Sequence, residues 1–381
     1  MSVAALRRLE GGFSLIEVLV TGMISSLIVL AAFEFLSAAS AVSAELEARQ
    51  RLIERARLAF LFLGDEIRQA ADFGCSGRIG PAQGNSAIAR DLSMLEPWQG
   101  LQGWEAANTQ YGSRVAAILP DAAVAATDTG WSSDGEQSDP PPLSADPLSD
   151  IIRLWRTEGE PLTLMERTRS ELLVYPREQQ DLVRGDLAVV NDCFAADLFQ
   201  LCEVSGPRSA AGLAPAPDDY SILTVDDSCS PGNVESAARR PLSDYRVTAR
   251  VRRLEGNLFY VGRRGNRSTN EPALYRRRLG KNGAFTASEE LVEGVENMQI
   301  LYGVDRASHD KAYLPASEVA DFSSVTSVRV FLLIRDGVGA RLGAITPTSY
   351  YGADYSEFNA ERSAGQFRGG FTGTFVIRSR R

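Results

Sequence analysis

The stretch that decides the fold is FSLIEVLVTGMISSLIVLAAFEFL, residues 13–36. From Phe13 to Phe33 its only ionisable side chain is Glu17. A helix of that length, at about 1.5 Å per residue, spans roughly 30 Å, the thickness of the hydrocarbon core of a bilayer. The stretch therefore predicts a membrane-inserted helix.

A short leader, MSVAALRRLEGG, precedes this helix at residues 1–12. Its Arg7 and Arg8 are expected to stay in the cytoplasm, which places everything after residue 36 on the other side of the membrane. A secretory signal has a shorter apolar region followed by a small-residue cleavage site, whereas this apolar run continues into a long helix. We therefore expect no cleavage downstream of the apolar run.

Glu17 needs a physical explanation, because a carboxylate inside hydrocarbon costs at least ~2.5 kcal/mol and usually indicates a charged partner. The alternative is a chance polar residue in a simple signal anchor. Glu34 lies near the outer end of the span, where its side chain can reach the interface at low cost, and we assign it no role.

The residues Gly12-Phe13-Ser-Leu-Ile-Glu17 resemble the type III signal of prepilins, with glycine before the cut and glutamate five residues after it. The resemblance implies cleavage between Gly12 and Phe13 by a prepilin peptidase at the cytoplasmic face, followed by N-methylation of Phe13. The new terminal ammonium of Phe13 would pair with Glu17 of a neighbouring subunit, and this pair would set the register between subunits.

Helical periodicity continues after residue 36, because apolar residues recur at threes, fours and their sums through residues 37–72. We predict one helix over about 13–72, whose first half is apolar all round and whose second half has one stripe that packs on a domain. Gly64 weakens this helix locally and is interpreted as a close-packing point. The long helix and the domain after it predict an α+β, pilin-like fold.

Residues 73–381 are predicted to form one β-rich globular domain with a loop-rich insertion at about 76–150. Its acidic segment 128–150 lacks the spacing of a calcium loop, so a solvated insertion is expected. Alternating segments predict strands. They are 151–155, 187–192, 197–204, the paired runs YRVTARVRRL (245–254) and NLFYVGRR (257–264), and SVRVFLLIRD (327–336), in which Val328, Val330, Leu332 and Ile334 share one face. LVEGVENMQILYGVD (291–305) and the C-terminal FTGTFVIRSRR are expected to be short helices or strands.

Four segments of this domain are similar to PilW-type minor pilins of type IV pili: GDLAVVNDCFAADLFQ, EPALYRRRLG, LVEGVENMQILYGVD and VRVFLLIRD. The resemblance implies a single-pass inner-membrane protein with a periplasmic domain that enters the pilus at the cell surface and primes its assembly, in a tip complex. Implied partners are other minor pilins, the major pilin, the prepilin peptidase, the inner-membrane assembly platform, membrane lipid and a PilC/PilY-type tip adhesin. Implied processes are twitching motility and cell adhesion.

The four cysteines, Cys75, Cys193, Cys202 and Cys229, contain no C-x-x-C pair, which favours disulfides and an oxidising compartment over zinc. Three pairings are possible. A hairpin of 187–192 and 197–204 would place Cys193 opposite residue 197, so we favour Cys75–Cys193 and Cys202–Cys229. Free thiols are the alternative.

Nucleic-acid binding and catalysis find little support in the sequence. The net charge is −9, and the ten arginines between 246 and 278 alternate with core residues, so no nucleic acid is expected. His309 is the only histidine and no catalytic, phosphate-binding or metal pattern surrounds it, so we predict a non-enzyme without cofactor or metal. Asp305 and Asp310 lack the glycine that a calcium turn would need.

Two other functions remain open. One is a type II secretion pseudopilin of the GspJ kind, against which the long domain argues. The other is a signal-anchored periplasmic binding or enzymatic domain whose N-terminus is never cut.

Overall fold

The structure, a computed structural model, describes most of the chain. The described residues are 14–74, 97–115, 130–133, 136–137, 145–168, 170–175, 182–192, 196–205, 221–225, 229, 233, 245, 249–263, 271–305, 311–336, 348–355 and 367–380.

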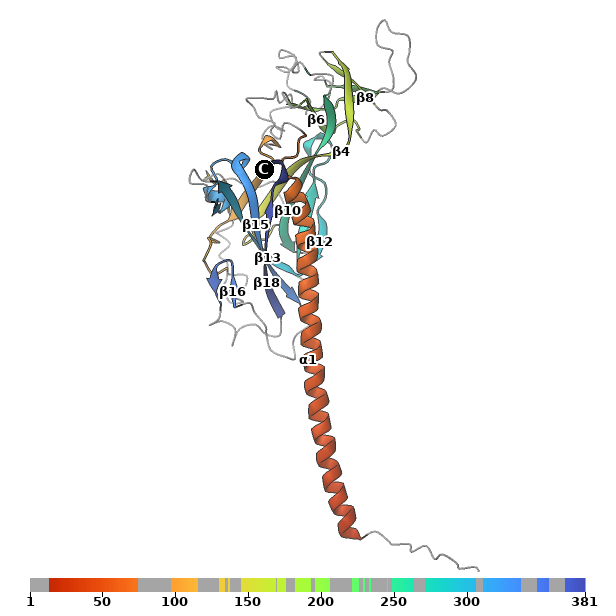
Figure 1. Ribbon diagram of the computed structural model, residues 1–381, viewed down its shortest axis with the longest axis vertical. Coiled ribbons are helices and arrows are strands. Elements are labelled where there is room, and N and C mark those ends of the chain that lie inside the picture. The colour runs from red at the N-terminus through yellow and green to blue at the C-terminus, as the bar shows by residue number, and fades with distance from the viewer. Residues whose placement is uncertain are drawn as a thin grey trace, which may run out of the picture.

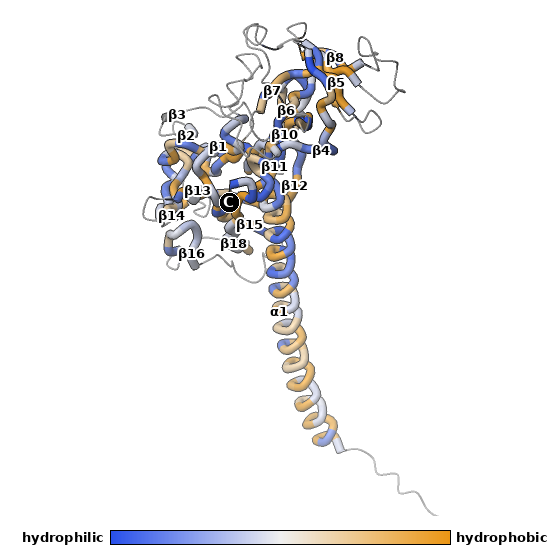
Figure 2. Tube along the Cα trace, turned by 45° about the horizontal axis from the view of Figure 1, so that its top comes forward, coloured by the Kyte–Doolittle hydropathy of each residue, from blue (hydrophilic) through white to orange (hydrophobic). Residues whose placement is uncertain are grey.

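One long helix, α1 (Leu15–Gln69), carries the globular domain at its C-terminal end (Figure 1). Its first half projects away from the domain, and Figure 2 shows that this half is predominantly hydrophobic. The helix ends where Ala71 adopts a positive φ of 59° and donates its N–H to the carbonyl of Trp155 at 2.7 Å. The bounds agree with the predicted helix over 13–72, and the helix on a β-rich domain confirms the predicted α+β, pilin-like layout.

The larger of the two main sheets is antiparallel and has 12 strands among the described residues. Its main path is β12 (Glu289–Glu293), β11 (Pro272–Arg278), β10 (Arg250–Arg263), β4 (Ile151–Arg167), β1 (Leu101–Ala106), β2 (Trp131–Ser133) and β3 (Glu136–Gln137). A branch adds β5 (Glu171–Tyr175), β9 (Ser221–Thr224) and β8 (Glu203–Ser205) beside β4, and β6 (Leu187–Asn191) and β7 (Ala196–Gln200) beside β10. Figure 1 shows this branch at the end of the domain farthest from the start of α1.

The smaller sheet has four antiparallel strands in the order β14 (Lys311–Leu314), β13 (Val295–Asp305), β15 (Val325–Asp336) and β18 (Phe367–Val376). A hairpin of β16 (Ser349–Tyr350) and β17 (Ala353–Asp354) packs on its outer face, where Phe331 and Leu333 meet Tyr350 and Tyr351. Its inner face packs on α1.

The main core joins the helix to both sheets. Leu52, Ala56 and Leu63 of α1 pack in one cluster with Phe259 of the larger sheet and the inner face of the smaller one. The four β15 residues predicted to share a face, Val328, Val330, Leu332 and Ile334, are all 0% exposed in this cluster, which confirms the alternation. The helix therefore shares one hydrophobic core with both sheets.

Several strand predictions change in the structure. Residues 250–254 of the first predicted run and 257–263 of the second belong to one continuous strand, β10. Gly256 forms no turn between them, and a Cβ on it would lie 2.2 Å from the ring of Trp155. Residues 197–204 divide into β7 and β8. In the β6–β7 hairpin residue 197 pairs with Val190, so the expected alignment of residue 197 with residue 193 is wrong. The tract 76–150 contains β1, which the sequence did not single out.

Candidate functional site

The first half of α1, residues 15–36, has exposed side chains along its whole length, and we call it the bare half. Leu15, Leu27 and Phe35 are 78%, 56% and 73% exposed, and the most apolar window of the helix has no buried residue. By length and composition this helix can cross a membrane. No described part of the domain covers these side chains, so their apolar surface has to be buried by something outside the chain.

Glu17 lies at the start of this bare half. Its Oε2 accepts the backbone N–H of Ser14 at 3.4 Å, and its own N–H bonds the carbonyl of Ser14 at 3.0 Å, which begins the helix. The side chain is exposed and forms no ion pair with any described residue. Gly12 and Phe13, the predicted cleavage and methylation residues, lie outside the described residues. Glu34, to which we assign no role, is exposed farther along the helix.

An exposed apolar stripe continues from the bare half into the half that carries the domain. Its members share one side of α1, because their spacings of seven and four residues are close to whole turns. They are Ile24, Ile28, Phe35, Val42, Leu46 and Ile53, and Glu17 lies on the same side of the helix. The stripe lies to one side of the face that the domain buries, so one helix can serve both contacts.

Ion pairs hold the second half of α1 on the domain near its middle. Arg51 Nε lies 2.7 Å from Asp336 Oδ2, and Arg55 Nη2 lies 2.5 Å from Glu293 Oε1. Arg55 also donates to the carbonyl of Arg335 at 3.0 Å. These contacts connect the helix to β15 and β12, the neighbouring strands of the two sheets.

A second polar junction lies near the end of the helix. Arg156 of β4 bonds Glu66 of α1 at 3.1 Å and Glu255 of β10 at 2.6 Å, and Asn257 donates to Glu66 at 3.1 Å. Burial alone would lower the pKa of Arg156, but Glu66 and Glu255 raise it above its ordinary value. Burial raises the pKa of Glu255, although Arg156 opposes this. The junction holds α1, β4 and β10 together through one cation.

Close packing fixes the helix between these two junctions. A Cβ on Gly64 would lie 2.4 Å from Cε1 of Phe375, so only glycine lets β18 approach the helix this closely, as the sequence suggested. The ring of Phe375 also meets Phe60 at 5.9 Å between centroids, and the guanidinium of Arg68 lies 5.1 Å above it.

The C-terminal residues anchor the end of the helix, which sequence reasoning missed. The Ser379 hydroxyl donates to the carbonyl of Ala70 at 2.8 Å. Arg380 donates to the carbonyls of Val325 at 2.8 Å and Phe322 at 2.5 Å, and also to that of Gln99. Nothing in a terminal S-R-R sequence indicates this role, because the carbonyls it satisfies are remote in the chain.

The comparisons with known proteins agree with this architecture. A family model described as Type IV Pilus-assembly protein W matches residues 258–379, about a third of the chain, from within β10 to the end of β18. Over these residues the chain is similar to PilW-type type IV pilus proteins. No curated protein and no solved structure matches it significantly. The PilW family implies a role in type IV pilus assembly, and the matched region contains the whole smaller sheet on which α1 packs.

One predicted disulfide is present among the described residues. Cys202 and Cys229 are bonded, with their Cα atoms 5.0 Å apart, and the bond ties the end of β7 to the segment after β9. This confirms the favoured pairing of these two residues. Cys75 and Cys193 lie outside the described residues.

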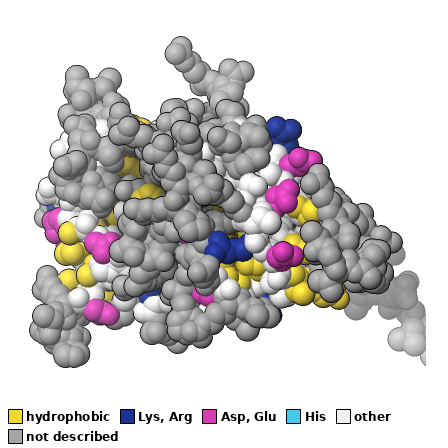
Figure 3. Space-filling model, turned by 90° about the horizontal axis from the view of Figure 1, so that it is seen from above, with side chains coloured by type: hydrophobic (Ala, Val, Ile, Leu, Met, Phe, Trp, Pro, Cys, Tyr) yellow, Lys and Arg dark blue, Asp and Glu magenta, His cyan; other side chains and the backbone are white. Residues whose placement is uncertain are grey.

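The arginine-rich strands are largely neutralised by acids of the same domain. Arg253 pairs with Glu158 at 3.0 Å, Arg263 with Asp146 at 3.1 Å, and Arg276 with Glu289 at 2.9 Å. On the face seen in Figure 3, the described arginines and lysines lie among acidic and apolar side chains. These pairs reduce the local positive charge around the described arginines.

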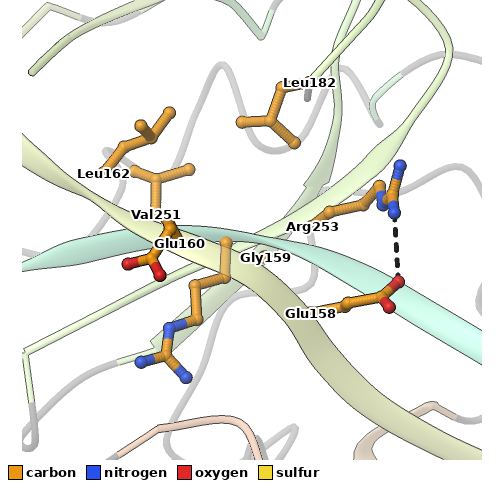
Figure 4. Close-up of a pocket in the computed structure, with 8 residues that line it drawn as sticks. Glu158, Gly159, Glu160, Leu162, Leu182, Val251 and Arg253 are labelled. Atoms are coloured by element: carbon orange, nitrogen blue, oxygen red, sulfur yellow. Dashed lines mark hydrogen bonds and ion pairs between the residues drawn. The ribbon is translucent and has the colours of Figure 1, made fainter. Parts of the chain in front are cut away.

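A small hollow opens where β4 and β10 lose register. The ladder shifts between Val251 and Arg253, and Gly159 adopts a positive φ of 87°. Figure 4 shows Leu162, Leu182 and Val251 on one side and the Arg253–Glu158 pair on another. We assign this hollow no ligand.

Within the described ranges no group of three or more His, Cys, Asp and Glu side chains could hold a metal ion. Asp305 lies exposed at the end of β13, and His309 and Asp310 are outside the described residues.

Proposed function

We propose that this protein is a PilW-type minor pilin that is cut between Gly12 and Phe13, methylated at Phe13, and incorporated in the pilus, where it primes assembly in a tip complex with other minor pilins. The observation that carries the proposal is the bare half of α1, whose apolar surface and unpaired Glu17 find no partner in the described part of the chain. A helix bundle of neighbouring subunits would bury the stripe and supply a terminal ammonium to Glu17.

The exposed apolar surface of α1 supports the expected location in the inner membrane, and the resemblance supplies the expected partners. Before assembly, lipid of the inner membrane would bury the bare half, with the domain in the periplasm. The peptidase, the assembly platform, the major pilin and a PilC/PilY-type tip adhesin follow as partners from the resemblance. We propose that the protein has no catalytic activity and needs no cofactor.

Replacing the residue before the cut tests the processing step. Gly12→Ala should leave nearly all of the protein at precursor length in the membrane, because the resemblance assigns glycine to the position before cleavage. N-terminal sequencing and intact mass of the purified protein measure this. Ser2→Ala, in the same leader but away from the cut, should be processed normally. A mature chain that begins at Met1 in the wild type would refute cleavage and favour the signal-anchored alternative.

Removing the carboxylate of Glu17 tests assembly separately from processing. Glu17→Ala should be cut normally yet enter pili about tenfold less or worse, because an ammonium left unpaired in hydrocarbon costs at least ~2.5 kcal/mol. Quantitative mass spectrometry of sheared pili against membranes gives the ratio. Glu34→Ala is the matched control, since it removes an acid of the same helix near the interface. Incorporation of Glu17→Ala at the wild-type level would remove the proposed ion pair.

Deleting the gene distinguishes a minor pilin from a type II secretion pseudopilin. If the protein is a minor pilin, the deletion should abolish or reduce pili while secreted enzymes continue to leave the cell. Retained pili with a secretion defect would instead assign the chain to type II secretion.

A further inference from the structure

Among the described strands, only β15 pairs with β18, so the other edge of β18 presents a long row of backbone groups with no strand partner. Ile377 donates its N–H to the carbonyl of Thr326 across the ladder, and Phe375 pairs with Val328 in the same register. In an antiparallel ladder the residues that bond the partner alternate with residues that point away from it. The odd-numbered residues of β18 therefore bond β15, and the N–H and C=O groups of Gly370, Thr372 and Thr374 point outward. All three residues are exposed.

This edge lacks the devices that protect other sheet edges. Proteins blunt free edges with short strands, charges, proline or a cover, because an open edge invites pairing with another chain. Among the described strands, β3, β8 and β14 have two to four residues, β12 carries three glutamates in five residues, and every residue of β7 is buried. In contrast, β18 has ten residues, and its one charged side chain, Arg368, is buried against Glu296 at 2.6 Å.

Charge and packing around the edge define what can bind there. Phe371 and Phe375 point toward α1, beside Phe60, and the exposed Ile53 lies on the same side of the helix. Near the C-terminal end of the strand lie Arg68, stacked on Phe375, and the exposed Arg378, whereas Arg329, which donates to Thr374 at 3.2 Å, has its guanidinium 3.9 Å above the ring of Tyr313 on β14. Arg68 and Arg378 form no ion pair with a described carboxylate. An added strand would thus meet an apolar flank and a basic end.

A second copy of this chain does not fit the edge. Leu52 lies near Gly369, Phe60 near Gly373 and Ala70 near Ser379, so β18 and α1 run in the same direction. Antiparallel pairing of two β18 edges would point the two bare helix halves in opposite directions, which one membrane cannot accommodate. Parallel pairing would bring the two arginine groups together, and like charges repel.

We propose that the free edge of β18 is a docking site for an extended acidic segment of another polypeptide, which adds as a strand beside β18 and places its carboxylates against Arg68 and Arg378. Main-chain hydrogen bonds supply affinity in this mode of recognition, and the flanking side chains supply specificity. The site does not depend on cleavage at Gly12 or on Glu17.

A designed peptide tests the site on the full chain in detergent. The probe is an N-acetylated peptide of alternating valine and threonine, with a fluorescent label at its C-terminal end and two aspartates at its N-terminal end, so that antiparallel pairing places the aspartates against the arginines. Fluorescence anisotropy should detect binding to the wild type. Thr372→Pro should weaken it about tenfold or more, because proline removes an outward donor without touching the β15 ladder. Thr372→Val keeps the donor and should bind like the wild type.

Charge exchange provides the second measurement. A peptide with lysines in place of the aspartates should bind the wild type about tenfold more weakly, and Arg378→Glu should reverse this preference. Thermal unfolding confirms that each variant is folded, and Arg378→Glu leaves the strand intact if Thr372→Pro does not fold. Equal binding by the wild type and a folded Thr372→Pro, or no preference for aspartate, would overturn the proposal. Self-association of the wild type that Thr372→Pro abolishes would also overturn it, since the occupant would then be a second copy.

Discussion

The two halves of α1 share one helix and differ in what buries them. Over residues 15–36 the side chains are exposed and mostly apolar, and Glu17 has no ion-pair partner among the described residues. Over residues 48–70 one face is buried in the domain, and Arg51, Arg55 and Glu66 each form an ion pair with a strand. The domain thus buries one face of the second half and supplies its ion-pair partners. The first half has neither among the described residues.

This difference shows where the stability of each half originates. Polar junctions and close packing fix the second half on both sheets. Because the helix is continuous, they also fix the direction in which the first half projects from the domain. The first half has only its backbone hydrogen bonds until lipid or other helices surround it. Changes in the second half should therefore alter unfolding of the domain, and changes in the first half should leave it unaffected.

The largest effect is expected from breaking the junction at the end of the helix. Arg156→Ala leaves Glu66 and Glu255 facing each other in a buried site without their cation, which should lower the free energy of unfolding by about 3–5 kcal/mol. Urea unfolding in detergent, followed by tryptophan fluorescence, measures it.

The control for this prediction lies on the same helix. Arg49 pairs with Glu45 at the surface, where it is 57% exposed, so Arg49→Ala should change stability by no more than about 0.5 kcal/mol. Equal losses for Arg49→Ala and Arg156→Ala would mean that the junction does not hold the helix on the domain.

The helix and its two faces could be predicted from the sequence, because both signals are local. An uninterrupted apolar run and a recurring stripe indicate α1 to within a few residues at each end, and strict alternation indicates the buried face of β15. The glycine at 64 also signals its role, since glycine inside a helix costs stability unless something packs against it.

The partners of these residues could not be predicted, because they are remote in sequence. Gly256 suggests a turn between two strands, whereas it accommodates the ring of Trp155 inside one strand. Arg156 and Arg380 act through groups far away in the chain, and neither has a local pattern that marks it. For the candidate site, Glu17 stands out by its charge in an apolar run, but the open edge of β18 exists only once the strand order is known.

A smaller effect should come from the two glycines of α1, one in each half. Gly64→Ala gains helix propensity but forces a methyl group against Phe375, whose ring is held by Phe60, Gly373 and Arg68. We expect a net loss of about 1 kcal/mol in the free energy of unfolding. Gly22 has nothing within 4 Å of the added methyl group, so Gly22→Ala should leave domain unfolding unchanged. Stabilisation by Gly64→Ala would show that the ring can move aside.

The smallest effect is expected at Glu105, a buried acid whose hydrogen-bond partner lies within the domain, in contrast to Glu17. Glu105 of β1 is 4% exposed and accepts the hydroxyl of Ser317. Burial raises the pKa of Glu105 above its ordinary value, and the hydrogen bonds from Ser317 only partly offset this. The folded chain therefore binds this proton more tightly than the unfolded chain, so stability falls as the pH rises from the ordinary carboxyl pKa to the raised one.

Glu105→Gln cannot ionise, yet its amide oxygen can still accept the Ser317 hydroxyl. The free energy of unfolding of the variant relative to that of the wild type should rise by less than about 1 kcal/mol as the pH rises from about 4 to about 7. Urea unfolding at both pH values measures this difference. Glu54→Gln, on the exposed side of α1, controls for the loss of one charge. A gap between Glu105→Gln and the wild type that is the same at both pH values would mean that burial of the carboxylate carries no proton-linked cost. In that case the domain would tolerate a buried acid without help, and the need of Glu17 for an outside cation would rest on the membrane alone.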